Sequence, residues 1–66
     1  MNWLDIMRLI IAIWPLIEKI LALISDSERD HILDAITTNV GRLLTGDVKM
    51  ANAEEAVTFI TAPLLA

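Results

Sequence analysis

The sequence has no cysteine and only one histidine, His31. Without cysteine the chain cannot form disulfides, and thiolate metal sites are excluded. A single histidine also excludes a histidine-rich zinc site. Aromatic residues are scarce as well, with one phenylalanine and two tryptophans, so most of the apolar bulk is aliphatic. We therefore expect no metal and no cofactor.

Basic residues are few and scattered. The chain carries five lysines and arginines against nine aspartates and glutamates, which gives a net charge of −4. Each basic residue has an acidic residue nearby in the sequence. Phosphate contacts require clustered Lys and Arg, so this pattern disfavours both nucleic-acid binding and polybasic attachment to anionic lipid. We predict no nucleic-acid partner.

The chain has an excess of aliphatic side chains. Its 66 residues are 56% hydrophobic, which exceeds the roughly 45–50% of typical soluble domains. A chain of this length forms a single domain, residues 1–66, and buries only about 60% of the surface that its unfolded form exposes. The surplus apolar surface is expected to meet copies of the chain, another protein or lipid.

Residues 3–25 have the pattern of a long amphipathic helix. At about 100° per residue, isoleucines form one stripe with alternating spacings of three and four, as at a heptad seam. Leucines at positions 9, 16 and 23 repeat every seven residues along one flank of this stripe. Pro15 removes one backbone hydrogen bond, so we expect either a kink near this residue or a division into two short helices. Asn2 is the expected N-cap.

The apolar stripe of this segment is the predicted interface. It is expected to pack against the other helices and against neighbouring subunits or a larger complex. Its members are Trp3, Ile6, Ile10, Ile13, Trp14, Ile17, Ile20, Leu21 and Ile24.

Two further helices are predicted, over residues 28–44 and 53–62. Gly46 is expected to follow the first of them, since glycine readily adopts the left-handed backbone at this position. Asn52 is the expected cap of the second, and Pro63 is expected to end it. No strand-like alternation occurs. The predicted fold class is all-α, a small bundle of three amphipathic helices completed by oligomerisation or by a larger complex.

No catalytic constellation is found in the sequence. Ser27, His31 and Asp30 are residue types of a serine triad, but they lie at a helix start, where Ser and Asp serve as caps. Glu54 and Glu55 are adjacent, so in a helix they point about 100° apart and do not form an acid/base pair. We predict that the chain is not an enzyme.

A membrane span is the less favoured interpretation of the first segment, because its four charged residues all lie on or beside one face of the predicted helix. A short span would require these charged side chains to reach the interface at both ends. A span needs about 20 apolar residues, whereas the uncharged run from Leu9 to Ile17 has nine. A signal peptide is disfavoured because Asp5 precedes any basic side chain and no small-residue cleavage site follows. The segment is interpreted as an amphipathic helix whose apolar face meets protein or a membrane interface.

Two functional hypotheses follow. The first is a non-enzymatic structural or assembly protein, viral or phage-encoded, that oligomerises or docks onto a larger complex in the cytoplasm or within a viral particle. The alternative is a membrane-active or membrane-embedded protein, either holin-like or with an interfacial amphipathic helix.

Many small phage proteins share the composition of residues 1–25, a Trp-containing apolar helix before a charged hinge. Holins commonly end in a basic tail, whereas this chain ends in APLLA. The balanced charges of the first helix favour protein partners.

Overall fold

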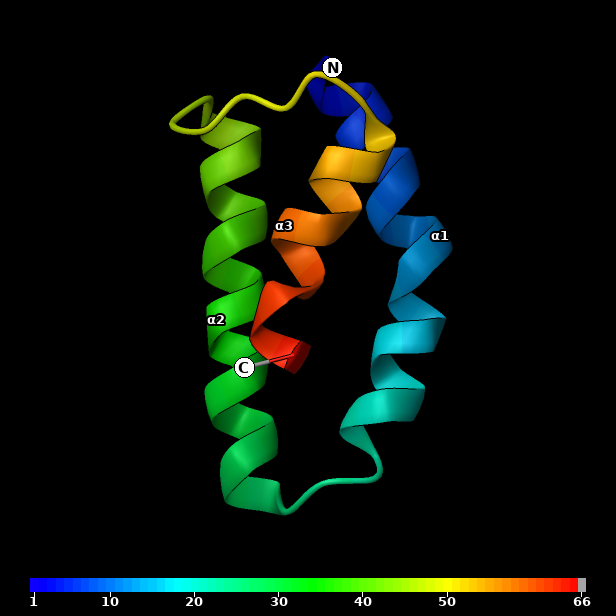
Figure 1. Cartoon of the computed structure of the whole chain (residues 1–66), viewed down its shortest axis with the longest axis vertical. Coiled ribbons are helices and arrows are strands. Elements are labelled where there is room, and N and C mark those ends of the chain that lie inside the picture. The colour runs from blue at the N-terminus through cyan, green and yellow to red at the C-terminus, as the bar shows by residue number, and fades with distance from the viewer. Residues whose placement is uncertain (66) are drawn as a thin grey trace.

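The computed structural model describes residues 1–65, which form three helices. Helix α1 spans Trp3–Leu21, α2 spans Asp26–Thr45 and α3 spans Ala53–Leu65. Each helix packs against both of the others (Figure 1). The predicted all-α bundle of three helices is therefore confirmed.

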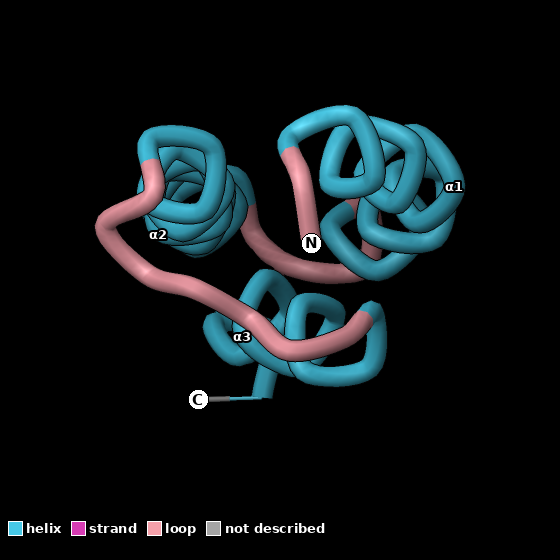
Figure 2. Tube along the Cα trace, turned by 90° about the horizontal axis from the view of Figure 1, so that it is seen from above, coloured by secondary structure: helices cyan, strands magenta, loops and turns pink. Residues whose placement is uncertain are grey.

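Helices α1 and α2 form an antiparallel hairpin, and α3 packs against both. Seen end-on, the three helices occupy the corners of a triangle (Figure 2). Helix α3 has 13 residues, whereas α1 has 19 and α2 has 20. It runs from the N-terminal end of the hairpin and stops well before the α1–α2 turn (Figure 1). The turn end of the hairpin is therefore less covered than the other end.

The core is aliphatic and draws on every helix. Ile36 and Ile60 are 0% and 1% exposed, and no polar or charged residue of the described chain is buried. The seven buried residues are Ile6, Ile17 and Leu21 from α1, Ile36 and Leu43 from α2, and Ala56 and Ile60 from α3. Because each helix supplies part of this cluster, no pair of helices completes the core alone.

Helix α1 begins as predicted but ends earlier. Asn2 Oδ1 accepts a hydrogen bond from the Asp5 N–H at 2.9 Å, which confirms the N-cap. The helix ends at Leu21 rather than at residue 25. Arg29 of α2 explains the early end, since its Nε donates to the Leu21 carbonyl at 3.0 Å and its Nη2 to the Ile24 carbonyl at 3.4 Å. These bonds satisfy carbonyls that a longer helix would have used.

Pro15 does not divide α1. The helix continues through this residue, and its axis bows outward near mid-length (Figure 1). Pro15 cannot donate to the carbonyl four residues before it, which belongs to Ile11. Ile11 is 69% exposed, so water can bind this carbonyl. Of the two predicted outcomes, division into two short helices is therefore not observed.

Helix α2 begins two residues before the predicted start at 28. Ser25 is its N-cap, with Oγ accepting a hydrogen bond from the Glu28 N–H at 3.4 Å. Its last residue is Thr45, followed by Gly46 with a φ of 83°. The expected left-handed glycine at the end of this helix is confirmed.

Helix α3 begins as predicted but continues past its proline. Asn52 Oδ1 accepts from the Glu55 N–H at 3.0 Å, which confirms the expected cap. The prediction that Pro63 ends the helix is wrong, because Pro63 lies inside α3. Pro63 has no N–H for the Phe59 carbonyl, and the side-chain amide of Asn39 on α2 donates to this carbonyl instead, at 3.0 Å. A tertiary hydrogen bond thus replaces the missing helical one.

Candidate functional site

The stripe predicted as an interface lies mostly inside the molecule. Its buried members are Ile6, Ile17 and Leu21, its half-buried members Ile10, Ile13, Trp14 and Ile24, and its exposed members Trp3 and Ile20. The half-buried members pack against the core. The centre of the stripe therefore holds α1 against α2 and α3, and its edges reach the surface.

Most of the exposed large apolar side chains lie on α1 or beside its ends. Of nine such residues in the described chain, seven fall within residues 1–23: Met1, Trp3, Leu4, Ile11, Leu16, Ile20 and Leu23. The other two are Leu44 and Leu65. Single exposed apolar residues are normal, but a concentration on one helix is typical of a surface that binds protein or lipid.

These side chains follow two flanks of α1, one on each side of the buried stripe. We call Leu9, Leu16 and Leu23 the leucine flank, of which Leu23 lies in the turn just past the end of α1. Its first member is half-buried, whereas Leu16 is 59% and Leu23 is 84% exposed. The opposite flank carries Leu4 and Ile11, which are 45% and 69% exposed. Helix α1 thus presents apolar surface on both sides of its contact with the bundle.

An apolar groove runs between α1 and α3 beside the leucine flank. Its volume is about 300 Å³, and its lining is formed by Ile13, Leu16, Ile17, Ile20, Val57, Thr61, Leu64 and Leu65. The Thr61 hydroxyl donates to the Val57 carbonyl, so its proton is already used within α3. Leu65 is 86% exposed. The groove and the leucine flank share Leu16 and form one continuous apolar surface.

Two opposite charges lie on the outer surface of α1 beside the leucine flank. Asp5 and Lys19 are each seven residues from Ala12, and all three are exposed. Seven residues return to within about 20° of the same direction around a helix. In residues 1–65 the one ion pair joins Arg29 to Asp26, so Asp5 and Lys19 have no ionic partner within the described chain. Helix α1 carries two acids and two bases, whereas α2 and α3 each carry a net charge of −2.

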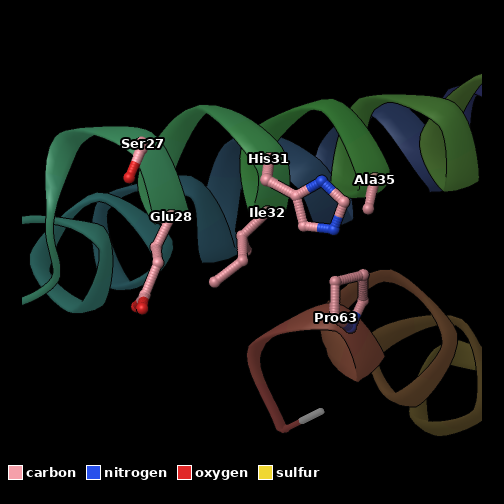
Figure 3. A pocket seen from close by; sticks show the side chains of 6 residues that line it. All are labelled: Ser27, Glu28, His31, Ile32, Ala35 and Pro63. Atoms are coloured by element: carbon pink, nitrogen blue, oxygen red, sulfur yellow. The ribbon is translucent and has the colours of Figure 1, made fainter.

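A more polar cleft lies between the first half of α2 and the end of α3. It has a volume of about 690 Å³ and is lined by Ser27, Glu28, His31, Ile32, Ala35 and Pro63. The His31 ring extends toward Pro63, whereas the Ser27 hydroxyl and the Glu28 carboxylate lie nearer the start of α2 (Figure 3). The three polar side chains do not converge on one point, so the cleft holds no paired nucleophile and base.

The part of the chain that the structure describes also shows no metal-binding cluster. Among residues 1–65, no three His, Asp or Glu side chains are placed to share an ion. None of the three described helices combines the length and apolar character needed to cross a bilayer. Every buried side-chain nitrogen or oxygen in this range has a hydrogen-bond partner.

The candidate site is therefore the apolar surface formed by the leucine flank and the adjacent groove. The sequence places Leu9, Leu16 and Leu23 beside the stripe through their seven-residue repeat, but the groove beside them forms only where α3 packs against α1. The sequence pattern does not indicate the contribution of Leu65, because the groove depends on how α3 packs against α1.

No protein-family model, curated protein or solved structure gave a significant match to the chain. Function is therefore inferred from the residues of this chain alone.

Proposed function

We propose that this chain is a small non-enzymatic structural or assembly protein that associates with copies of itself or with a larger complex through the outer surface of α1. The supporting observation is the concentration of exposed large apolar side chains on this one helix and directly beside its ends. Protein association would remove this surface from water, which is the main favourable term in most such contacts. The setting we propose is the cytoplasm or a viral particle.

The distribution of charge supports protein association through α1 rather than through the other helices. Helix α1 is balanced, with two acids and two bases, whereas α2 and α3 are acidic. Charged residues are depleted at the centre of protein interfaces. The leucine flank and the groove meet this condition, since their lining includes no charged side chain.

Sedimentation velocity of the full chain without detergent tests this proposal. Wild type is expected to form a discrete oligomer, and Leu16→Glu is expected to dissociate it because each contact would then bury an unpaired carboxylate. Leu44→Glu, at an exposed leucine of α2, is the control and is expected to leave the oligomer intact. A wild-type chain that remains monomeric up to about 1 mM would overturn self-association, since it places Kd above this value.

Attachment to a membrane interface is the second candidate. Trp3 is 64% exposed and is followed by Leu4 and Ile11 on the flank opposite the leucines, with Arg8 close to them. Tryptophan and arginine are typical of helices that lie in the interface between headgroups and acyl chains.

Tryptophan fluorescence distinguishes this candidate. In a Trp14→Phe chain, Trp3 is the only tryptophan, so its emission reports the exposed end of α1 directly. A blue shift on addition of phosphatidylcholine vesicles, together with co-sedimentation, would support interfacial binding. Unchanged emission with the chain left in the supernatant would exclude it for these vesicles.

A further inference from the structure

We infer that the leucine flank binds the same flank of a second copy of this chain, with the two α1 helices antiparallel about a twofold axis beside Ala12. This inference rests on the proposed function and specifies the partner and its orientation. Three features support it: the placement of opposite charges on α1, the spacing of the leucines, and the exposure of all the side chains involved except the half-buried Leu9.

The charges of this face are arranged symmetrically about Ala12. Asp5 precedes Ala12 by seven residues and Lys19 follows it by seven. An α-helix rises about 1.5 Å per residue, so each charge lies about 10 Å from Ala12 along the axis. Because seven residues make almost two full turns, both charges project from nearly the same side of α1 as Ala12.

A twofold axis beside Ala12 would bring opposite charges together. In the antiparallel arrangement, Asp5 of one copy lies level with Lys19 of the second copy, and the symmetry repeats this pair at the other end. A parallel arrangement would instead place Asp5 beside Asp5 and Lys19 beside Lys19. A twofold interface uses the same patch on both chains, so the patch must complement itself. The seven-residue spacing of these two charges meets this requirement.

Two leucines of the same flank, Leu9 and Leu16, fit this register. With the axis at Ala12, Leu9 of one copy lies about 1.5 Å along the axis from Leu16 of the second copy. The small side chain of Ala12 lies at the crossing point, where it permits a close approach of the two helices. Leu16 and Leu65, which are 59% and 86% exposed, border the same surface on the α3 side. The second copy would cover both.

A second copy satisfies this face better than lipid does. Asp5 lies beside the leucine flank. A second copy places Lys19 level with this carboxylate, whereas a lipid surface places no cationic group at a fixed position beside it. Neither charge has an ionic partner within residues 1–65. A carboxylate is also unfavourable within the apolar region of a membrane. The leucine flank is therefore assigned to protein, whichever partner the opposite flank binds.

Charge exchange between copies tests this assignment in the full chain. Asp5→Lys alone places like charges together at both ends of the interface, and Lys19→Glu does the same with acids. Each variant is expected to weaken self-association about tenfold at low salt, because two attractive pairs become repulsive. An equimolar mixture of the two variants is expected to recover wild-type affinity, since all pairs in the mixed dimer are again opposite. Asp34→Lys, an exposed acid on α2, is the control and is expected to have no such effect.

The outcomes separate this inference from the proposed function. Recovery in the mixture, measured by sedimentation equilibrium with circular dichroism showing both variants folded, supports the antiparallel pair. If wild type self-associates but the single variants do so equally well, or their mixture recovers nothing, the pairing is overturned while self-association stands. If wild type is monomeric throughout, both the pairing and self-association fail.

Discussion

Asn39 is the residue that allows α3 to continue through a proline. Its amide donates to the Phe59 carbonyl at 3.0 Å, in place of the N–H that Pro63 lacks. We expect Asn39→Ala to lower the free energy of unfolding by about 1–2 kcal/mol, because a partly buried carbonyl loses its partner. Urea denaturation followed by circular dichroism measures this loss. Thr38→Ala is the neighbouring control and is expected to change stability little, since Thr38 is exposed.

A double-mutant cycle identifies the cause. Pro63→Ala restores a backbone N–H that can donate to the Phe59 carbonyl within the helix. In this background we expect the loss of unfolding free energy caused by Asn39→Ala to be smaller, by about 0.5 kcal/mol or more. An equal cost in both backgrounds would mean that Asn39 stabilises the chain through packing alone.

These positions also mark the limit of sequence reasoning at this scale. The caps at Asn2 and Asn52 were predictable because each bonds an N–H three residues away. The passage of α3 through Pro63 was not predictable, because it depends on a donor to the Phe59 carbonyl from another helix. This donor, Asn39, lies 20 residues before Phe59 in the chain. Local hydrogen bonds can be inferred from a short window of sequence, whereas a tertiary bond requires the packing of α2 against α3.

At the scale of whole elements, the two glycines of the chain lie inside α2 and directly after it, and they are expected to respond oppositely to substitution. A methyl group added to Gly41, inside the helix, would meet no packed neighbour within 4 Å, whereas Gly46 follows the helix with a φ of 83°. We expect Gly41→Ala to raise the free energy of unfolding by about 0.5–1 kcal/mol, because alanine favours the helical backbone more. Gly46→Ala is expected to lower it by about 1 kcal/mol through left-handed backbone strain. Thermal unfolding of the pair measures both, and shifts of the same sign would contradict this account.

Helix existence was easier to predict than helix ends. The spacing of apolar residues predicted all three helices, because each must bury one face. The apolar pattern continues through Ile24 and so predicts an end at residue 25, whereas α1 ends at Leu21. The chain turns earlier because Arg29 binds the carbonyls of Leu21 and Ile24 from the following helix. Apolar periodicity reports which side chains face the core and contains no information on such a cap.

At the scale of the whole molecule, a small core is combined with a large exposed apolar surface on one helix. The sequence indicated too much apolar surface for one small domain, but not which part of α1 would remain outside. Helices α2 and α3 cover the centre of the stripe and leave Leu16 and Ile11 exposed on either side. This division depends on the relative placement of three helices, which the pattern of a single helix does not determine.

The stability of the molecule should consequently depend on its concentration. If the leucine flank binds a second copy, association stabilises the folded state by mass action, and the Tm of wild type is expected to rise with protein concentration. Leu16 is 59% exposed, so Leu16→Glu is expected to change the folding of the single chain little while removing the dependence on concentration. Calorimetry over a range of about 100-fold in concentration distinguishes the two chains. A free partner concentration of 100 times Kd stabilises the folded state by about 2.7 kcal/mol. A wild-type Tm that is constant over this range would show that the surface of α1 is not covered by copies of the same chain.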